Sequence, residues 1–82
     1  MSEYLNQYRK FKESNPTFIM FFRIGDFYEI FNDDAVLACR ILGLSLATKN
    51  GIPMAGIPVA NVECYLRRMI AAGHRCAICD KN

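Results

Sequence analysis

The chain has 82 residues, of which 52% are apolar and 22% charged, and its formal net charge at pH 7 is +2. A chain of this length forms one small domain. No apolar run reaches about 18 residues, which excludes an ordinary membrane-spanning helix. The first residues lack a basic segment followed by an apolar one, so we expect no secretory signal and a cytoplasmic location. The weakly basic charge permits a nucleic-acid partner without requiring one.

Four cysteines are present, at positions 39, 64, 76 and 79. Cys76 and Cys79 form a C-x-x-C pattern, which can bind zinc or perform redox chemistry. A second such pair is missing, and a strand would direct these two thiols to opposite faces. We therefore expect free thiols that pack as small apolar groups, with no bound metal and no disulfide.

Residues 3–14 have the spacing of an amphipathic helix. Its apolar positions recur every three or four residues: Tyr4, Leu5, Tyr8 and Phe11. Ser2 can cap the start, and Pro16 marks the end because proline disfavours the α conformation in the residue before it. We expect the basic residues of this helix to form a solvated face: Arg9, Lys10 and Lys12.

Residues 17–23 are almost wholly apolar, which predicts a central strand covered on both faces. Gly25 and Asp26 then supply the chemistry of a tight turn. Residues 27–31 are rich in aromatic and branched side chains, which indicates a second strand.

Side chains alternate between the two faces of a strand, so Phe27 and Glu29 share one face of the 27–31 strand. Tyr28 and Ile30 share the other. If Tyr28 and Ile30 face the core, Phe27 and Glu29 stand side by side on the outer face, and we expect Phe27 to be exposed. The alternative is a bend at Glu29 that leaves Phe27 in the core.

A second helix is predicted over residues 33–42, with Asn32 as its cap. Asp33 and Asp34 lie in its first turn, where carboxylates interact favourably with the helix dipole. Paired aspartates can also bind a metal, but their position favours the dipole explanation. Gly43 ends the helix in a left-handed conformation.

The remaining chain predicts a strand at 44–48, a turn at 49–51 and an extended segment at 52–58. Two prolines in that segment suggest an edge strand or a shaped loop. A helix over about 61–72 and a strand at 74–79 follow. The helix should bury a stripe of apolar residues: Val62, Tyr65, Leu66, Met69 and Ile70. The order αββαββαβ predicts an α+β fold, with a small mixed sheet flanked by about three helices.

Catalytic patterns are absent from the sequence. It contains no phosphate-binding loop and a single histidine, His74, so no nucleophile and base are paired by spacing. Asp26 and Glu29 could form an acid–base pair, but nothing in a turn followed by a strand makes them converge. We expect a protein that is not an enzyme and uses no cofactor of its own.

Several segments together resemble the N-terminal mismatch-recognition domain of the MutS DNA mismatch repair family. In chain order they are FFRIGDFYEIF (21–31), DDA (33–35), IPMAGIP (52–58), YL (65–66) and AIC (77–79). The resemblance covers nearly the whole chain. The combination of GDFYE with a downstream IPMAGIP is specific.

The resemblance implies a role for four residues in DNA binding. In the family, the phenylalanine of an F-x-E motif enters the minor groove and stacks on a mispaired base, and the glutamate hydrogen-bonds that base. These residues correspond to Phe27 and Glu29. Lys49 would meet the DNA backbone, unless it is an ordinary exposed turn lysine. Met54 would approach the minor groove beside the wedge, unless it packs in the core.

The resemblance also implies partners and boundaries. The expected partner is double-stranded DNA with mismatches or small unpaired loops, in a cytoplasmic, nucleoid-associated setting. Residues 1–82 would form one domain that stops before the family's last strand and before its clamp and ATPase domains. ATP and Mg²⁺ would bind only in those absent domains. The chain alone would be a monomer, and dimers would need the full-length protein.

Two departures from the family keep a second function open. The turn at 49–51 is shorter than the family's loop, and Asp80-Lys81-Asn82 follow Cys79 where the family usually has Glu-Gln. The alternative function is a protein-interaction module that keeps the fold without binding mismatches. In that case, Phe27 would bury against a partner protein.

Overall fold

The computed structural model describes residues 3–80. The elements are α1 (Glu3–Ser14), β1 (Phe18–Ile24), β2 (Phe27–Phe31), α2 (Asn32–Leu42), β3 (Ala47–Lys49), β4 (Ile52–Pro58), the 3-10 turn η1 (Val59–Asn61), α3 (Val62–Ala71) and β5 (Arg75–Asp80). The predicted order and the α+β class are confirmed. No helix within residues 3–80 is long and apolar enough to cross a membrane. The predicted cap Ser2 lies outside the described residues.

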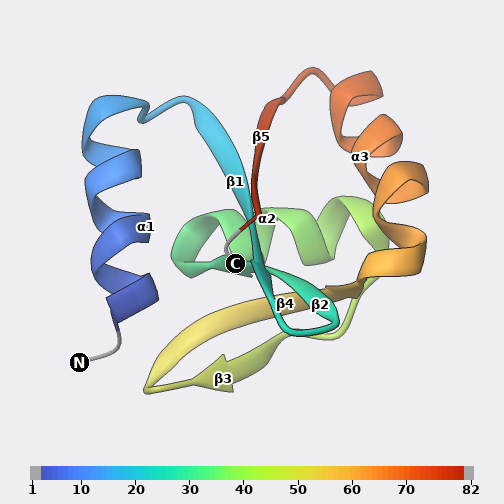
Figure 1. Cartoon of the computed structure of the whole chain (residues 1–82). Coiled ribbons are helices and arrows are strands. Elements are labelled where there is room, and N and C mark those ends of the chain that lie inside the picture. Colours follow the sequence, from blue (N-terminus) through green and yellow to red (C-terminus); the bar gives the residue numbers. More distant parts are fainter. Residues whose placement is uncertain (1–2, 81–82) are drawn as a thin grey trace.

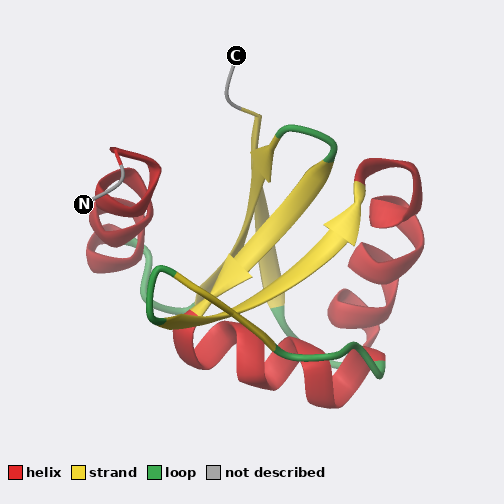
Figure 2. Ribbon diagram, turned by 90° about the horizontal axis from the view of Figure 1, so that it is seen from below, coloured by secondary structure: helices red, strands yellow, loops and turns green. Residues whose placement is uncertain are grey.

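The five strands form one mixed sheet in the order β3-β4-β2-β1-β5 (Figure 1). β5 runs parallel to β1, and every other neighbouring pair is antiparallel. The crossover from β4 through α3 therefore returns the chain to the far edge of the sheet. Figure 2 shows the sheet between α1 on one side and α2 with α3 on the other.

Each face of the sheet has its own hydrophobic cluster. On the face that α2 and α3 cover, the buried residues include Ile19, Phe21, Tyr28, Ile30, Ala55, Ile57 and Met69. On the α1 face they are Leu5, Tyr8, Met20, Phe22 and Phe31. Both alternating sets of β1 are therefore buried, which confirms the prediction of a central strand.

β4 is an interior strand, so the prediction of an edge strand or a loop at residues 52–58 was wrong. Its two prolines nevertheless lie where β4 has a single neighbour. Pro53 pairs with Thr48 of β3, before the pairing with β2 begins at Met54. Pro58 pairs with Phe27 of β2, beyond the end of β3. The missing N–H of each proline is tolerated because only one side of the strand needs donors there.

Three local predictions also need correction. Asn32 provides no side-chain cap for α2; it adopts a positive φ of 60°, and Phe31 occupies the cap position. β3 begins at Ala47 rather than at residue 44. Ile70 is 56% exposed, because α3 packs on the sheet through Met69 and its neighbours rather than through the full predicted stripe. The predicted end of α2 is confirmed, since the Gly43 N–H donates to the Cys39 carbonyl at 2.9 Å.

Candidate functional site

Phe27 is an exposed residue that directly follows the tight turn of the hairpin formed by β1 and β2. Gly25 adopts a φ of 63° in the two-residue turn between β1 and β2, and Ile24 pairs with Phe27 across it. Glycine adopts such a φ without the steric cost that most other residues incur. The Val59 N–H donates to the Asp26 carbonyl at 3.0 Å, which ties the turn to the end of β4. The backbone beneath Phe27 is therefore held from two directions.

The burial pattern of β2 confirms the predicted alternation at its start. Phe27 is 46% exposed, whereas Tyr28 is 5% exposed and Ile30 is fully buried. Tyr28 is held further by its hydroxyl, which donates to Asp80 Oδ1 at 2.5 Å. This hydrogen bond raises the pKa of Tyr28. The alternative, a bend that buries Phe27, is wrong.

Gly56 of β4 forms part of the floor beside Phe27. It pairs with Glu29, so both residues and Phe27 belong to the α1 face of the sheet. A Cβ atom at Gly56 would lie 3.6 Å from Cδ2 of Phe27 and 3.7 Å from Sδ of Met54. The absence of a side chain at Gly56 thus leaves room for the Phe27 ring between the strands.

Glu29 shares this face with Phe27 as predicted, but it does not stand in water. The residue is 7% exposed. Lys49 covers it, and the Lys49 Nζ donates to Oε1 and Oε2 of Glu29 at 2.9 Å each. The expectation of an exposed carboxylate was wrong because it considered β2 alone, whereas the covering group comes from β3.

Lys49 is held by its hairpin and by α1. It pairs with Ile52 across the turn of Asn50 and Gly51, whose φ values are 53° and 79°. Positive φ at both positions is the pattern of a type I′ hairpin, which the Asn-Gly sequence favours. The Lys49 Nζ also lies 5.2 Å from the centre of the Tyr4 ring.

Lys49 is therefore not an ordinary exposed turn lysine, since 31% of its side chain is exposed and its amine is ion-paired. Burial alone would lower the pKa of Lys49. The hydrogen bond and the negative charge of Glu29 oppose this, and the net effect is a raised pKa. The ammonium form is therefore favoured at neutral pH.

Met54 lies between the two roles that the sequence allowed. It pairs with Phe31 on β2 and packs partly against the α1 cluster. Its sulfur also approaches Gly56, beside Phe27. Met54 thus connects the core under α1 to the uncovered end of the same face.

The four residues singled out in the sequence lie on one face of the sheet, and α1 covers only part of it. Phe31 is fully buried under α1, while Phe27 at the other end of β2 is exposed. Sequence reasoning missed Gly56 and Tyr4 as members of this site. A glycine inside a strand is a signal of close approach and could have identified Gly56. No comparable signal marked Tyr4.

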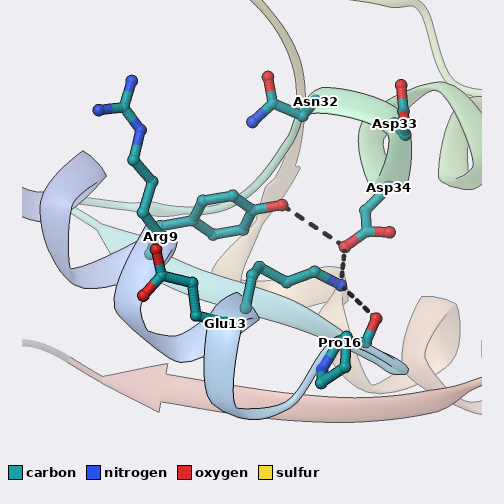
Figure 3. A pocket seen from close by; sticks show the side chains of 8 residues that line it. Arg9, Glu13, Pro16, Asn32, Asp33 and Asp34 are labelled. Carbon is teal, nitrogen blue, oxygen red and sulfur yellow. Dashed lines mark hydrogen bonds and ion pairs between the residues drawn. The ribbon is translucent and has the colours of Figure 1, made fainter.

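A separate pocket of about 460 Å³ lies between α1 and the start of α2 (Figure 3). The Lys12 Nζ bonds Asp34 Oδ2 at 2.8 Å and the carbonyls of Pro16 and Phe18 at 3.1 and 2.6 Å. The expectation of a solvated Lys12 was therefore wrong. The Tyr8 hydroxyl donates to the Phe31 carbonyl at 3.0 Å. Burial and the nearby Asp34 carboxylate raise the pKa of Tyr8. The contacts of Lys12 and Tyr8 with Asp34 join α1 to α2.

The cysteines follow the predicted alternation. Cys76 packs against the α2–α3 cluster and Cys79 against the α1 cluster, so their side chains lie on opposite faces of β5. Burial raises the pKa of the Cys76 thiol, which favours its neutral form. In the part of the chain that the structure describes, no three His, Cys, Asp or Glu side chains are grouped to hold a metal ion.

The fold is that of a small α+β domain that presents an exposed aromatic ring beside an ion-paired carboxylate. The model of the MutS domain I family matches residues 2–82. The chain belongs to this family, which confirms the resemblance to the mismatch-recognition domain of MutS proteins. The matched domain is not the ATPase part of those proteins.

Individual relatives agree with the family match. A DNA mismatch repair protein MutS of Nitrobacter winogradskyi is 48% identical over 84 residues, which cover 95% of this chain and 9% of the relative. One from Rhodopseudomonas palustris is 46% identical over 88 residues, which cover 100% of this chain and 10% of the relative. One from Sorangium cellulosum is 46% identical over 82 residues, which cover 94% of this chain and 9% of the relative. The chain thus spans about a tenth of the length of these relatives.

Proposed function

We propose that this domain recognises mispaired or unpaired bases in double-stranded DNA from the minor groove. Phe27 inserts beside the affected base and stacks on it, and Glu29 accepts a hydrogen bond from that base. Lys49 and Met54 lie at the same surface, with Lys49 close to the phosphates and Met54 beside the wedge. The domain needs no cofactor for this role.

The observation that carries the proposal is the exposure of Phe27 on a firmly held backbone. Its strand neighbours are buried and the preceding turn is tied to Val59, so the ring projects from a rigid base. Inserting an apolar side chain into a duplex costs a few kcal/mol per unstacked base step. Stacking of a base on an aromatic ring returns about 1–3 kcal/mol. The balance favours sites where a mismatch has already weakened the stack.

The electrostatics of the site support the same function. A bare carboxylate approaching two rows of phosphates would be repelled, but in the free chain Lys49 neutralises Glu29 at 2.9 Å. The net charge of +2 adds only weak general attraction. Discrimination would then depend mainly on how easily the duplex deforms, because the minor groove offers a degenerate base code.

The relatives are named DNA mismatch repair proteins and are about ten times as long as this chain, which supports a role within a longer protein. We infer that ATP and Mg²⁺ bind in domains outside residues 1–82, and that dimerisation requires them. The isolated chain would act as a monomer. Its cellular site would be the nucleoid in the cytoplasm.

The test compares a duplex carrying one mismatch with its matched counterpart, both titrated with the chain and followed by fluorescence anisotropy. We expect tighter binding to the mismatched duplex, and we expect Phe27→Ala to abolish that preference. Ile70→Ala is the matched control, because Ile70 is a comparably exposed apolar residue on α3, on the opposite side of the sheet. If Phe27→Ala and Ile70→Ala behaved alike, the wedge would be refuted and a protein-interaction role favoured.

A further inference from the structure

Glu29, which we propose contacts the base, forms an ion pair with Lys49, which we propose lies near the phosphates. Within residues 3–80, Glu29 is the sole charged residue that is buried. Both of its carboxylate oxygens accept a hydrogen bond from the Lys49 Nζ at 2.9 Å. A base that approaches Glu29 therefore meets a nearly buried carboxylate that is already covered by the Lys49 ammonium group.

Lys49 is equally constrained while the pair is intact. Its charge is cancelled by Glu29, so it adds little net attraction to a phosphate. Its backbone is fixed by a two-residue turn, and its amine lies against the Tyr4 ring. Nevertheless, 31% of its side chain is exposed, so the protein does not enclose Lys49 completely.

Lys49 directly precedes the two-residue turn of Asn50 and Gly51. A tight type I′ turn restricts where the residue before it can lie. The position of Lys49 over Glu29 is thus set by the hairpin as well as by charge.

We propose that Lys49 and Glu29 exchange partners when a mismatch is recognised. The unpaired hydrogen-bonding group of a mispaired base replaces the ammonium at Glu29, and Lys49 moves to a DNA phosphate. In a matched pair the groups on the Watson–Crick edges of the bases are engaged with each other, so the ion pair stays closed and Lys49 contributes no phosphate contact. Lys49 is then a positioning residue that links base recognition to backbone affinity. This inference rests on the proposed function of the site.

The exchange has a measurable signature in the salt dependence of binding. Each phosphate that the protein neutralises adds about −0.9 to the slope of log K against log salt concentration. For the unaltered chain, we expect the slope for a mismatched duplex to be steeper than for the matched duplex by about this amount. A difference of one contact changes the mismatch preference about threefold between 50 and 200 mM salt.

Variants of Glu29 and Lys49 test whether their ion pair causes the difference in slope between the mismatched and matched duplexes. Glu29→Gln releases Lys49 whether or not a mismatch is present, so both duplexes should show the steeper slope. Lys49→Met removes the contact, so both should show the shallower slope. Lys10→Met is the control, because it removes the same charge from an exposed position on α1 and should keep the difference between duplexes.

The double variant Glu29→Gln/Lys49→Met leaves no buried charge at the site, which keeps the test valid if Lys49→Met alone unfolds. We expect it to show the shallow slope. Glu29→Gln alone should also bind the matched duplex more tightly, because the released Lys49 contacts a phosphate, and the double variant should lose that gain. If that gain persisted, it would come from removed repulsion, and the exchange would be overturned.

The two proposals fail in different ways. Equal slopes for both duplexes, with mismatch preference intact and dependent on Phe27, would overturn the exchange and leave the wedge standing. Absence of mismatch preference in the unaltered chain would refute the proposed function and the exchange together.

Discussion

The ring of Phe27 lies over Gly56 of the neighbouring strand, where an added Cβ would come within 3.6 Å of its Cδ2 atom. This distance is an ordinary van der Waals contact, so a methyl group fits, and we expect a larger side chain to push against the ring. The position of the Phe27 ring therefore depends on the missing side chain of Gly56 as well as on the turn at Gly25 and Asp26.

Substitutions at Gly56 should separate the position of the ring from the stability of the fold. Gly56→Ala should leave the free energy of unfolding within about 1 kcal/mol of the unaltered chain and retain mismatch preference. Gly56→Leu should displace the ring and remove the preference, even where far-UV circular dichroism shows a folded chain. Equal mismatch preference in both variants would contradict a supporting role for Gly56.

Lys12 should contribute to stability through its three contacts. Lys12→Met removes hydrogen bonds to the Pro16 and Phe18 carbonyls and the ion pair with Asp34. Hydrogen bonds to charged groups are worth about 1.5–3 kcal/mol, so we expect a loss of that order in urea unfolding. Lys10→Met, on the exposed side of the same helix, should change the free energy of unfolding by less than about 0.5 kcal/mol.

Lys12 and Glu29 show where prediction from the sequence stops. The alternation of β2 correctly predicted an exposed Phe27 over a buried Tyr28, because that property depends on one strand. The cover over Glu29 comes from Lys49, twenty residues away, and depends on the strand order β3-β4-β2. Periodicity contains no information about strand order, so the burial of Glu29 could not be predicted.

The same limit explains the error at Lys12. Its helical position faces away from the apolar stripe, and a solvated side chain was the natural expectation. The fold brings Asp34 from the next helix and the Phe18 carbonyl from β1 within reach. The end of α2 at Gly43 and the hairpin at Asn50 were predicted correctly, because turn chemistry is local.

Stability should fall at alkaline pH, partly through Tyr8. Burial and the Asp34 carboxylate raise the pKa of Tyr8 in the folded state above its ordinary value of 10.0. The resulting stabilisation is fully present below pH 10 and is lost as the pH rises through the folded-state pKa. Tyr8→Phe should therefore lower stability at pH 7 by about 0.5–1.5 kcal/mol, through its lost hydrogen bond, but decline less steeply above pH 10. A decline parallel to that of the unaltered chain, in urea unfolding from pH 7 to 11, would exclude Tyr8 as a cause.

DNA binding by this chain should be weak and sensitive to salt. Few cationic groups are available at the site, so the dissociation constant should lie near the non-specific range, roughly 10⁻⁴ M or weaker. The slope of log K against log salt should correspond to a few phosphates, at about −0.9 each. Anisotropy titrations over a series of salt concentrations measure both quantities. Tight binding that salt does not weaken would contradict this expectation.

The most direct test of the wedge is a nuclear Overhauser measurement between the Phe27 ring protons and a duplex containing one mismatch. The account predicts cross-peaks from the ring to the mispaired base and its deoxyribose, and their absence with the matched duplex. Ring protons that keep contacts only within the protein, while the DNA shifts amides elsewhere on the sheet, would contradict the central role of Phe27.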